Sequence, residues 1–190
     1  MNAPALVAPR GPLIPSGMLG MAIFLATEVM FFAALVSALL VLRAGALEWP
    51  PAGQPRLPIT VTGVNTAFLL LSAVAFEFGA RRQHDRAALS RGLGGALALG
   101  SVFVLLQGVE WVRLIHFGLT THSSLYGATF YAIVGAHAVH VLVAIAALGF
   151  ALRAARCGRL RERTELAPYR MYWLFVVGIW PVLYGLVYWA

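Results

Sequence analysis

Several ingredients of a soluble enzyme are scarce or missing in this sequence of 190 residues. Lysine is absent, cysteine occurs once, and charged residues make up only 11% of the chain, whereas soluble domains carry about 25%. The single Cys157 excludes a disulfide framework within the chain and a metal site built from several cysteines. Hydrophobic residues instead make up 61%, and the mean hydropathy of +0.82 is typical of a membrane protein.

Catalytic signatures are missing as well. The sequence contains no G-x-x-x-x-G-K phosphate loop, no serine-nucleophile motif and no cysteine pair. The net charge of +7 could indicate nucleic-acid binding, but all fourteen cations are arginines that lie between apolar segments, where membrane orientation accounts for them. We therefore expect a membrane subunit that has no chemistry of its own and no nucleic-acid partner.

Five apolar segments are each long enough to cross a membrane, for which about 20 helical residues suffice. They cover approximately residues 17–42, 59–79, 92–115, 125–152 and 169–189. Because the connections are short, residues 17–190 are predicted to form a single domain, an all-α membrane protein with a bundle of five transmembrane helices. Residues 1–16 contain four prolines and no basic region before an apolar core, so they are predicted to be an extended arm and not a signal peptide.

The arginines predict how the bundle is oriented. One side of the membrane would hold eleven of them: Arg10, Arg81, Arg82, Arg86, Arg91, Arg153, Arg156, Arg159, Arg161, Arg163 and Arg170. The other side would hold three: Arg43, Arg56 and Arg113. Because cytoplasmic loops are enriched in basic residues, the N-terminus is predicted in the cytoplasm and the C-terminus outside. The expected location is a bacterial cytoplasmic (inner) membrane, which the chain crosses several times.

One carboxyl is predicted near the middle of the membrane. Glu28 lies eleven residues into the first apolar segment, which is roughly 16 Å along a helix. A charge at that depth is costly, and ionisable residues within membranes mostly mark functional paths. Glu28 is either a neutral carboxyl hydrogen-bonded between helices or a functional group in a proton relay or at a lipid or ligand contact. The sequence favours the functional interpretation.

Two further carboxyls lie near predicted helix ends. Glu77 precedes Arg81 by four residues, a spacing typical of an ion pair on a helix surface, so we expect an interfacial pair. Glu110 precedes Arg113 by three residues and could pair in the same way, or it could face the bundle beside Gln107. The sequence leaves both possibilities open for Glu110.

Two histidines share a face of the fourth segment. His137 and His140 are three positions apart, so they lie about 60° apart around a helix. Two histidines can indicate a metal or a haem, but a copper site usually needs more nitrogens or a sulfur, and the other histidines fall in or beside predicted loops. We expect no metal or cofactor in this chain. The expected buried polar network comprises Glu28, Asn65, Glu110, His137 and His140.

Short motifs follow one another in a specific order along the chain. They are TEVMFFA at residues 27–33, WPP at 49–51, VNT at 64–66, LQGVEW at 106–111, YGATFY at 126–131 and GAHAVHV at 135–141. Together they resemble the landmarks of subunit III of haem–copper oxidases, the cytochrome c oxidase family. The resemblance spans residues 17–190 and matches the short, five-helix form that lacks the first two helices of longer members.

The resemblance implies that the oxygen chemistry belongs to partner subunits. Haems and copper are expected in those subunits, with subunit I as the main partner and subunits II and IV and phospholipids as further partners. The implied role is to hold lipid and to support oxygen delivery, proton uptake and the stability of subunit I. Glu28 corresponds to the family's buried, carbodiimide-reactive glutamate. We expect Glu28, His137 and His140 to form a hydrogen-bonded core beside a lipid pocket.

One departure from the family pattern keeps alternatives open. In the family, a Tyr-Trp pair in the last helix is followed by a histidine and, three residues later, by an aspartate, whereas this chain has Leu174 and Val177. A related accessory membrane protein of nitric oxide reductase operons shares the scaffold and is the nearest alternative. A small haem-binding membrane electron carrier that uses His137 or His140 is an alternative of another class. A small transporter is a third, although no inverted repeat supports it.

Overall fold

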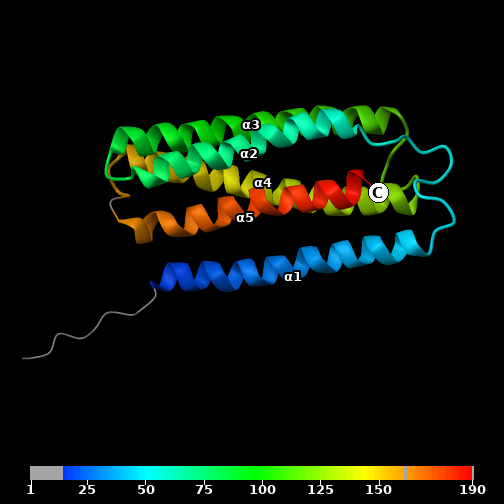
Figure 1. The fold of residues 1–190 in the computed structure, drawn as a ribbon, viewed down its shortest axis with the longest axis horizontal. Helices are drawn as coiled ribbons and strands as arrows, with labels where there is room; N and C mark the ends of the chain where they lie inside the picture. Colours follow the sequence, from blue (N-terminus) through cyan, green and yellow to red (C-terminus); the bar gives the residue numbers. More distant parts are fainter. Residues whose placement is uncertain (1–14, 161, 190) are drawn as a thin grey trace, which may run out of the picture.

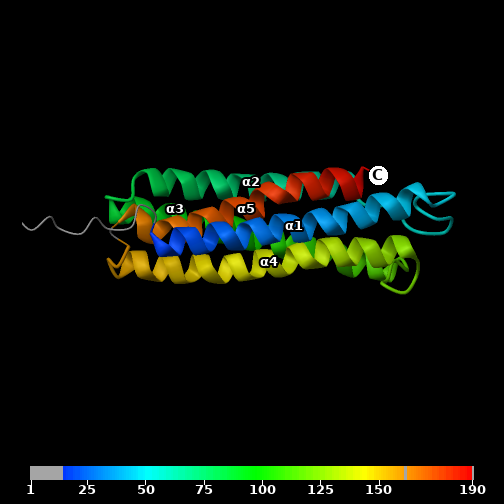
Figure 2. The same ribbon diagram turned by 90° about the horizontal axis from the view of Figure 1, so that it is seen from below.

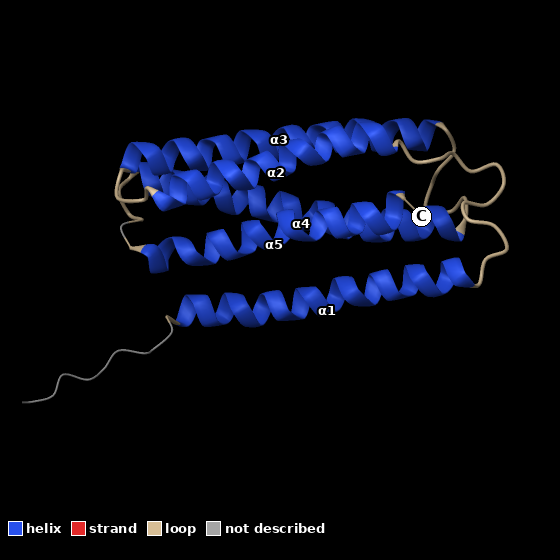
Figure 3. Ribbon diagram, viewed as in Figure 1, coloured by secondary structure: helices blue, strands red, loops and turns tan. Residues whose placement is uncertain are grey.

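The structure is a computed structural model that describes residues 15–160 and 162–189. Five helices, α1 (Ser16–Ala44), α2 (Ile59–Arg81), α3 (Arg86–His116), α4 (Leu125–Arg156) and α5 (Arg163–Tyr188), run along one long axis (Figure 1). Each is long and apolar enough to cross a membrane. The described residues contain no strand (Figure 3). The predicted all-α, five-helix membrane architecture is confirmed. Most of the predicted arm lies outside the described residues.

Two helices begin six residues earlier than the apolar pattern predicted. α3 begins at Arg86 because the Asp85 carboxylate accepts hydrogen bonds from the backbone N–H groups of Ala87 and Ala88, at 2.9 and 3.2 Å. α5 begins at Arg163, where the Glu165 carboxylate accepts a hydrogen bond at 3.1 Å from the backbone N–H of Glu162. Charged residues interrupt the apolar pattern near both starts, Arg86 and Arg91 in α3 and Arg163 and Glu165 in α5, so hydropathy alone places the start of each helix too late.

The helix termini gather at two ends of the bundle (Figure 1). The start of α1 and the α2–α3 and α4–α5 connections lie at one end, which we call the arginine-rich end. The α1–α2 and α3–α4 connections and the end of α5 lie at the other. The arginines at the described positions are thus distributed between the ends as the sequence indicated. Which end faces the cytoplasm stays a prediction.

α2 and α3 form the closest pair of helices. A Cβ atom built on Gly92 would lie 2.5 Å from the Cα of Gly79 and 2.8 Å from the carbonyl oxygen of Ala75. Since only hydrogen can occupy that space, the two backbones meet without intervening side chains, as small residues allow in membrane helix pairs. This contact fixes α2 and α3 as one unit.

α1 lies at the edge of the bundle. Among the described helices it contacts only α4 and α5, and Figure 1 shows it set apart from α2 and α3. In the view from below, it lies in front of the bundle, between α4 and the red end of α5 (Figure 2). Only Phe32 and Leu39 of its residues are buried. Most of its apolar side chains therefore face outward, toward lipid or toward another protein.

Candidate functional site

Glu28 of α1 and His140 of α4 form a direct contact between the edge helix and the bundle. His140 Nε2 lies 2.8 Å from Glu28 Oε2, and the two side chains are 17% and 16% exposed. The phenyl ring of Phe32 packs edge-on against the imidazole, with ring centres 5.1 Å apart. The mid-membrane carboxyl predicted from the sequence therefore has a specific partner on a neighbouring helix.

The second imidazole nitrogen determines where the protons of this pair are. His140 Nδ1 lies 2.7 Å from the backbone carbonyl oxygen of Ala136. A carbonyl can only accept, so Nδ1 must carry a hydrogen and donate it. One further proton is then needed between Nε2 and Glu28 Oε2, because two bare lone pairs at this distance would repel. Whether that proton lies on oxygen or on nitrogen, the pair has no net charge, which lowers the cost of a glutamate in a membrane.

His137 lies apart from this pair. It is 1% exposed, and its ring stacks on Trp180 of α5 with centres 4.8 Å apart. Neither of its ring nitrogens has a hydrogen-bond partner among the described residues. The predicted hydrogen-bonded core of Glu28, His137 and His140 is therefore wrong for His137. The offset of about 60° between positions three apart turns this ring toward the bundle interior, where it also meets the rings of Phe32 of α1 and Phe103 of α3 edge-on, with centres 6.4 and 6.5 Å apart.

Around His137 the structure forms a small apolar cavity of about 150 Å³. Phe103, Gln107, Trp111 and Trp180 contribute to its walls. His137 is thus a packed interior residue beside a cavity.

Asn65 belongs to a second, separate polar network. Its side-chain amide donates to the carbonyl oxygen of Phe103 at 3.0 Å and to Gln107 Oε1 at 3.3 Å. The Gln107 amide in turn donates to the Tyr188 hydroxyl at 3.0 Å, so the network joins α2, α3 and α5 in the interior. Reasoning from the sequence missed Gln107 and Tyr188 as members; the polar Gln107 within an apolar helix was the signal available. The single predicted network is therefore two networks.

Glu110 combines the two possibilities that the sequence left open, because it pairs with Arg113 and is itself buried in the bundle, as Gln107 is. Its carboxylate accepts a hydrogen bond from Arg113 at 2.9 Å within α3. This ion pair lies near the end of α3 that is opposite the arginine-rich end. Glu110 is thus separate from both networks.

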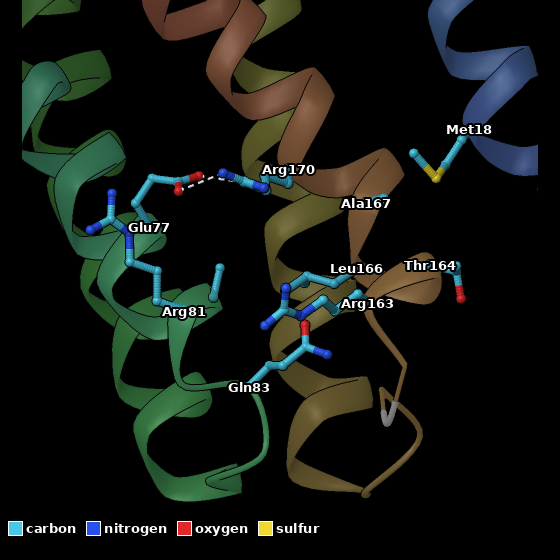
Figure 4. A pocket seen from close by; sticks show the side chains of 10 residues that line it. Met18, Glu77, Arg81, Gln83, Arg163, Thr164, Leu166, Ala167 and Arg170 are labelled. Atoms are coloured by element: carbon cyan, nitrogen blue, oxygen red, sulfur yellow. Dashed lines mark hydrogen bonds and ion pairs between the residues drawn. The ribbon is translucent and has the colours of Figure 1, made fainter. Parts of the chain in front are cut away.

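The predicted ion pair between Glu77 and Arg81 is wrong. Glu77 instead accepts two hydrogen bonds from Arg170 of α5, at 2.6 and 2.8 Å (Figure 4). A planar guanidinium that reaches across from another helix offers two parallel donors, a geometry stronger than a single contact along a helix. Arg81, the last residue of α2, forms no ion pair within the described part of the chain.

Residues that could hold a metal ion do not gather anywhere in the described ranges. No three His, Cys, Asp or Glu side chains there lie close enough to form a metal site. Of the two histidines of α4, His140 is already hydrogen-bonded to a carboxyl, and His137 is packed among aromatic rings. The expectation that this chain carries no cofactor stays a prediction.

These features define a class of protein. Five long apolar helices, whose inward polar groups hydrogen-bond to one another, form a multi-pass membrane protein in which the described polar groups hold helices together. Comparison with known proteins then gives the family. The family profile described as cytochrome c oxidase subunit III matches residues 12–190.

Individual relatives agree with that match. The chain is 34% identical over 176 residues to cytochrome c oxidase subunit 3 of Synechocystis sp., covering 90% of this chain and 74% of the relative. It is 33% identical over 174 residues to a probable cytochrome c oxidase subunit 3 of Nocardia farcinica, covering 89% and 85%. The subunit of Pongo pygmaeus is 31% identical over 183 residues, covering 90% and 68%. This chain belongs to the cytochrome c oxidase subunit III family.

Proposed function

We propose that this chain is the non-catalytic subunit III of a haem–copper terminal oxidase in an aerobic respiratory chain. It would lie in a bacterial cytoplasmic membrane, with the arginine-rich end in the cytoplasm, beside the subunit I that carries haem and copper. Subunits II and IV and phospholipids are the further partners. Its role would be to bind lipid and to support oxygen delivery, proton delivery and the stability of subunit I.

The observation that carries this proposal is the Glu28–His140 pair on the edge helix. Membership of the family supports a place in an oxidase complex, and the pair indicates what this chain contributes there. α1 packs on the bundle along one side only, so its remaining surface meets lipid or a partner subunit. The Glu28–His140 pair holds one proton between Glu28 Oε2 and His140 Nε2 and has no net charge. Such a neutral pair is suited to a helix whose outer surface meets lipid or a partner subunit.

Purification of the tagged chain from its native membrane, followed by an optical spectrum and an oxygen-uptake assay, tests the proposal. Haem a or haem o bands, copper and oxygen uptake in the co-purified material, with none in the stripped chain, are expected. Haem b with nitric oxide turnover and no oxygen uptake would identify the reductase accessory protein, the alternative that Leu174 and Val177 keep open. A Soret band that stays with the isolated chain would identify an electron carrier.

Variants of the same complex test the role of the pair. We expect Glu28→Ala to reduce the number of turnovers that the complex completes before it is inactivated, and to lower the amount of phospholipid that the complex retains. Glu110→Gln, which removes a carboxylate at one end of α3, is the matched control. If Glu28→Ala assembled normally, retained the same lipids and lasted for as many turnovers, the pair would not have the proposed role.

A further inference from the structure

A charged pocket opens at the arginine-rich end, where α2 ends and α5 begins (Figure 4). Its volume of about 410 Å³ is within the usual range of small-ligand sites, about 300–1,000 Å³. The pocket is lined by three arginines, Arg81, Arg163 and Arg170, and by one acid, Glu77. The lining therefore has an excess of two positive charges.

The acid in this pocket is already neutralised. Both oxygens of Glu77 accept hydrogen bonds from Arg170, so the negative charge of Glu77 is offset by this guanidinium and not by the other two cations. Arg81 and Arg163 have no carboxylate partner and no hydrogen bond among the described residues. The excess positive charge of the pocket thus resides on two unpaired guanidinium groups.

Neutral groups in the lining add to the same preference. Gln83 is largely buried and presents a side-chain amide to the pocket, and Figure 4 shows it and Arg163 extending toward each other. The N-terminus of α5 itself is occupied by its own carboxylates, Glu162 and Glu165, so the preference for an anion comes from the side chains of the pocket. The two unpaired cations and an amide donor together favour a group with several negatively charged oxygens.

The remaining walls of the pocket are apolar. Met18 of α1, Ala80 of α2 and Leu166 and Ala167 of α5 line it beside the charged residues. Its place at the end of membrane-spanning helices puts the charged part at the level of lipid head groups and the apolar part beside the hydrocarbon. A ligand with an anionic head and an apolar body fits both parts.

We propose that this pocket binds a phosphate group, with Arg81 and Arg163 as its cationic contacts and Gln83 as a neutral donor. The phosphate can come from an anionic phospholipid or from a free phosphate ester. The lipid form of the proposal deepens the proposed lipid-binding function and rests on it. Arginine suits this task because its planar guanidinium matches the oxygens of a phosphate with two donors at once.

Titration of the purified full chain, followed by native mass spectrometry, tests the pocket with three probes. They are dioleoylphosphatidylglycerol, dioleoylglycerol with the same chains but no phosphate, and glycerol 3-phosphate with no chains. In the variant Arg81→Gln/Arg163→Gln, affinity for the phosphatidylglycerol should fall about tenfold or more, since two charge-assisted contacts are lost. Affinity for dioleoylglycerol should stay unchanged. Both substituted side chains are exposed, so the fold should persist.

A matched variant separates the pocket from general surface charge. Arg91→Gln/Arg156→Gln removes two exposed cations from the same end of the bundle, outside the pocket. It should change affinity for the phosphatidylglycerol less than twofold. An equal loss in both double variants, or no loss in Arg81→Gln/Arg163→Gln, would overturn the proposal. Glu77→Gln should tighten binding, because it removes the acid and frees Arg170; weaker binding would contradict the assignment.

The remaining outcomes identify the source of the phosphate and separate this site from the subunit's role. Binding of glycerol 3-phosphate that also depends on Arg81 and Arg163 would assign the pocket to free phosphate esters. Binding of the phosphatidylglycerol alone would assign it to lipid. If the chain did not co-purify with an oxidase but kept this arginine-dependent binding, the proposed function would fail and the pocket would stand. If the chain co-purified with an oxidase, but Arg81→Gln/Arg163→Gln bound lipid as well as the unsubstituted chain does, the proposed function would stand and the pocket assignment would fail.

Discussion

Removal of one partner from the Glu28–His140 contact should loosen α1 from the bundle. The contact is the only side-chain hydrogen bond that joins α1 to another helix within the described part of the chain. Only Phe32 and Leu39 of α1 are buried, so this helix has few other contacts to hold it. We therefore expect a measurable effect from substitutions that leave the core untouched.

The free-energy cost of each substitution, and the difference between the two, follow from how Glu28 and His140 share a proton. Hydrogen bonds between membrane helices contribute about 0.6 kcal/mol on average and about 1.7 at most, and those to charged groups about 1.5–3. For a contact of 2.8 Å that is mostly shielded from solvent, we expect a coupling energy of about 1–2 kcal/mol. His140→Leu should cost more than Glu28→Leu, because it leaves a carboxyl without its partner, whereas the lone imidazole keeps its Ala136 hydrogen bond.

A double-mutant cycle with Glu28→Leu, His140→Leu and the double variant measures this energy. Unfolding of the chain in mixed micelles, followed by tryptophan fluorescence, gives the free energy of each variant. The double variant should be more stable than the sum of the single losses predicts, because two apolar groups replace a satisfied pair. Single losses that add within about 0.3–0.5 kcal/mol would show that the two residues are not coupled and would refute the reasoning.

Two other sites give predictions in the same unfolding assay. Gly92→Val should destabilise the chain by about 1–3 kcal/mol, because the added side chain meets the backbone of Gly79. Gly94→Ala should be neutral or stabilise the chain by up to about 1 kcal/mol, because a Cβ atom at Gly94 would have no neighbouring atom within 4 Å. Equal effects at the two glycines would contradict the close approach of α2 and α3. His137→Leu should cost less than His140→Leu, since His137 makes no hydrogen bond with described residues and loses only its ring contacts with Trp180, Phe32 and Phe103. A larger cost would show that its nitrogens have a partner.

The five helices could be predicted from the sequence because their signal is local. Each apolar run is long enough to span a bilayer, and the membrane itself requires such runs to be helical. The starts of α3 and α5 were placed late because Asp85 and Glu165, which fix them, are polar residues outside the apolar pattern. The boundaries depend on capping, whereas the existence of the helices depends on hydropathy.

The partners of the polar residues could be predicted only in part. Glu110 pairs with a residue three positions away, a spacing visible in the sequence. Glu77 pairs with Arg170, 93 positions away, and this pairing depends on how α2 and α5 are turned toward each other. The partners of His137 and His140 likewise lie on other helices, Trp180 on α5 and Glu28 on α1. The direction in which each helix face points is set by packing across the bundle, which spacing along one chain does not encode.

The position of the Glu28–His140 pair on the least buried helix has a physical reason. In a membrane, lipid tails solvate apolar side chains as well as a neighbouring helix does, so apolar contacts alone hold an edge helix weakly. A hydrogen bond to a second polar group is directional, and breaking it leaves both groups in hydrocarbon. The interior helices α2, α3 and α5 have a network through Asn65 and Gln107, whereas α1 has this single pair. A neutral, proton-sharing contact therefore fixes the position of α1, and lipid or a partner that competes for this proton would act on the one polar contact that holds the helix.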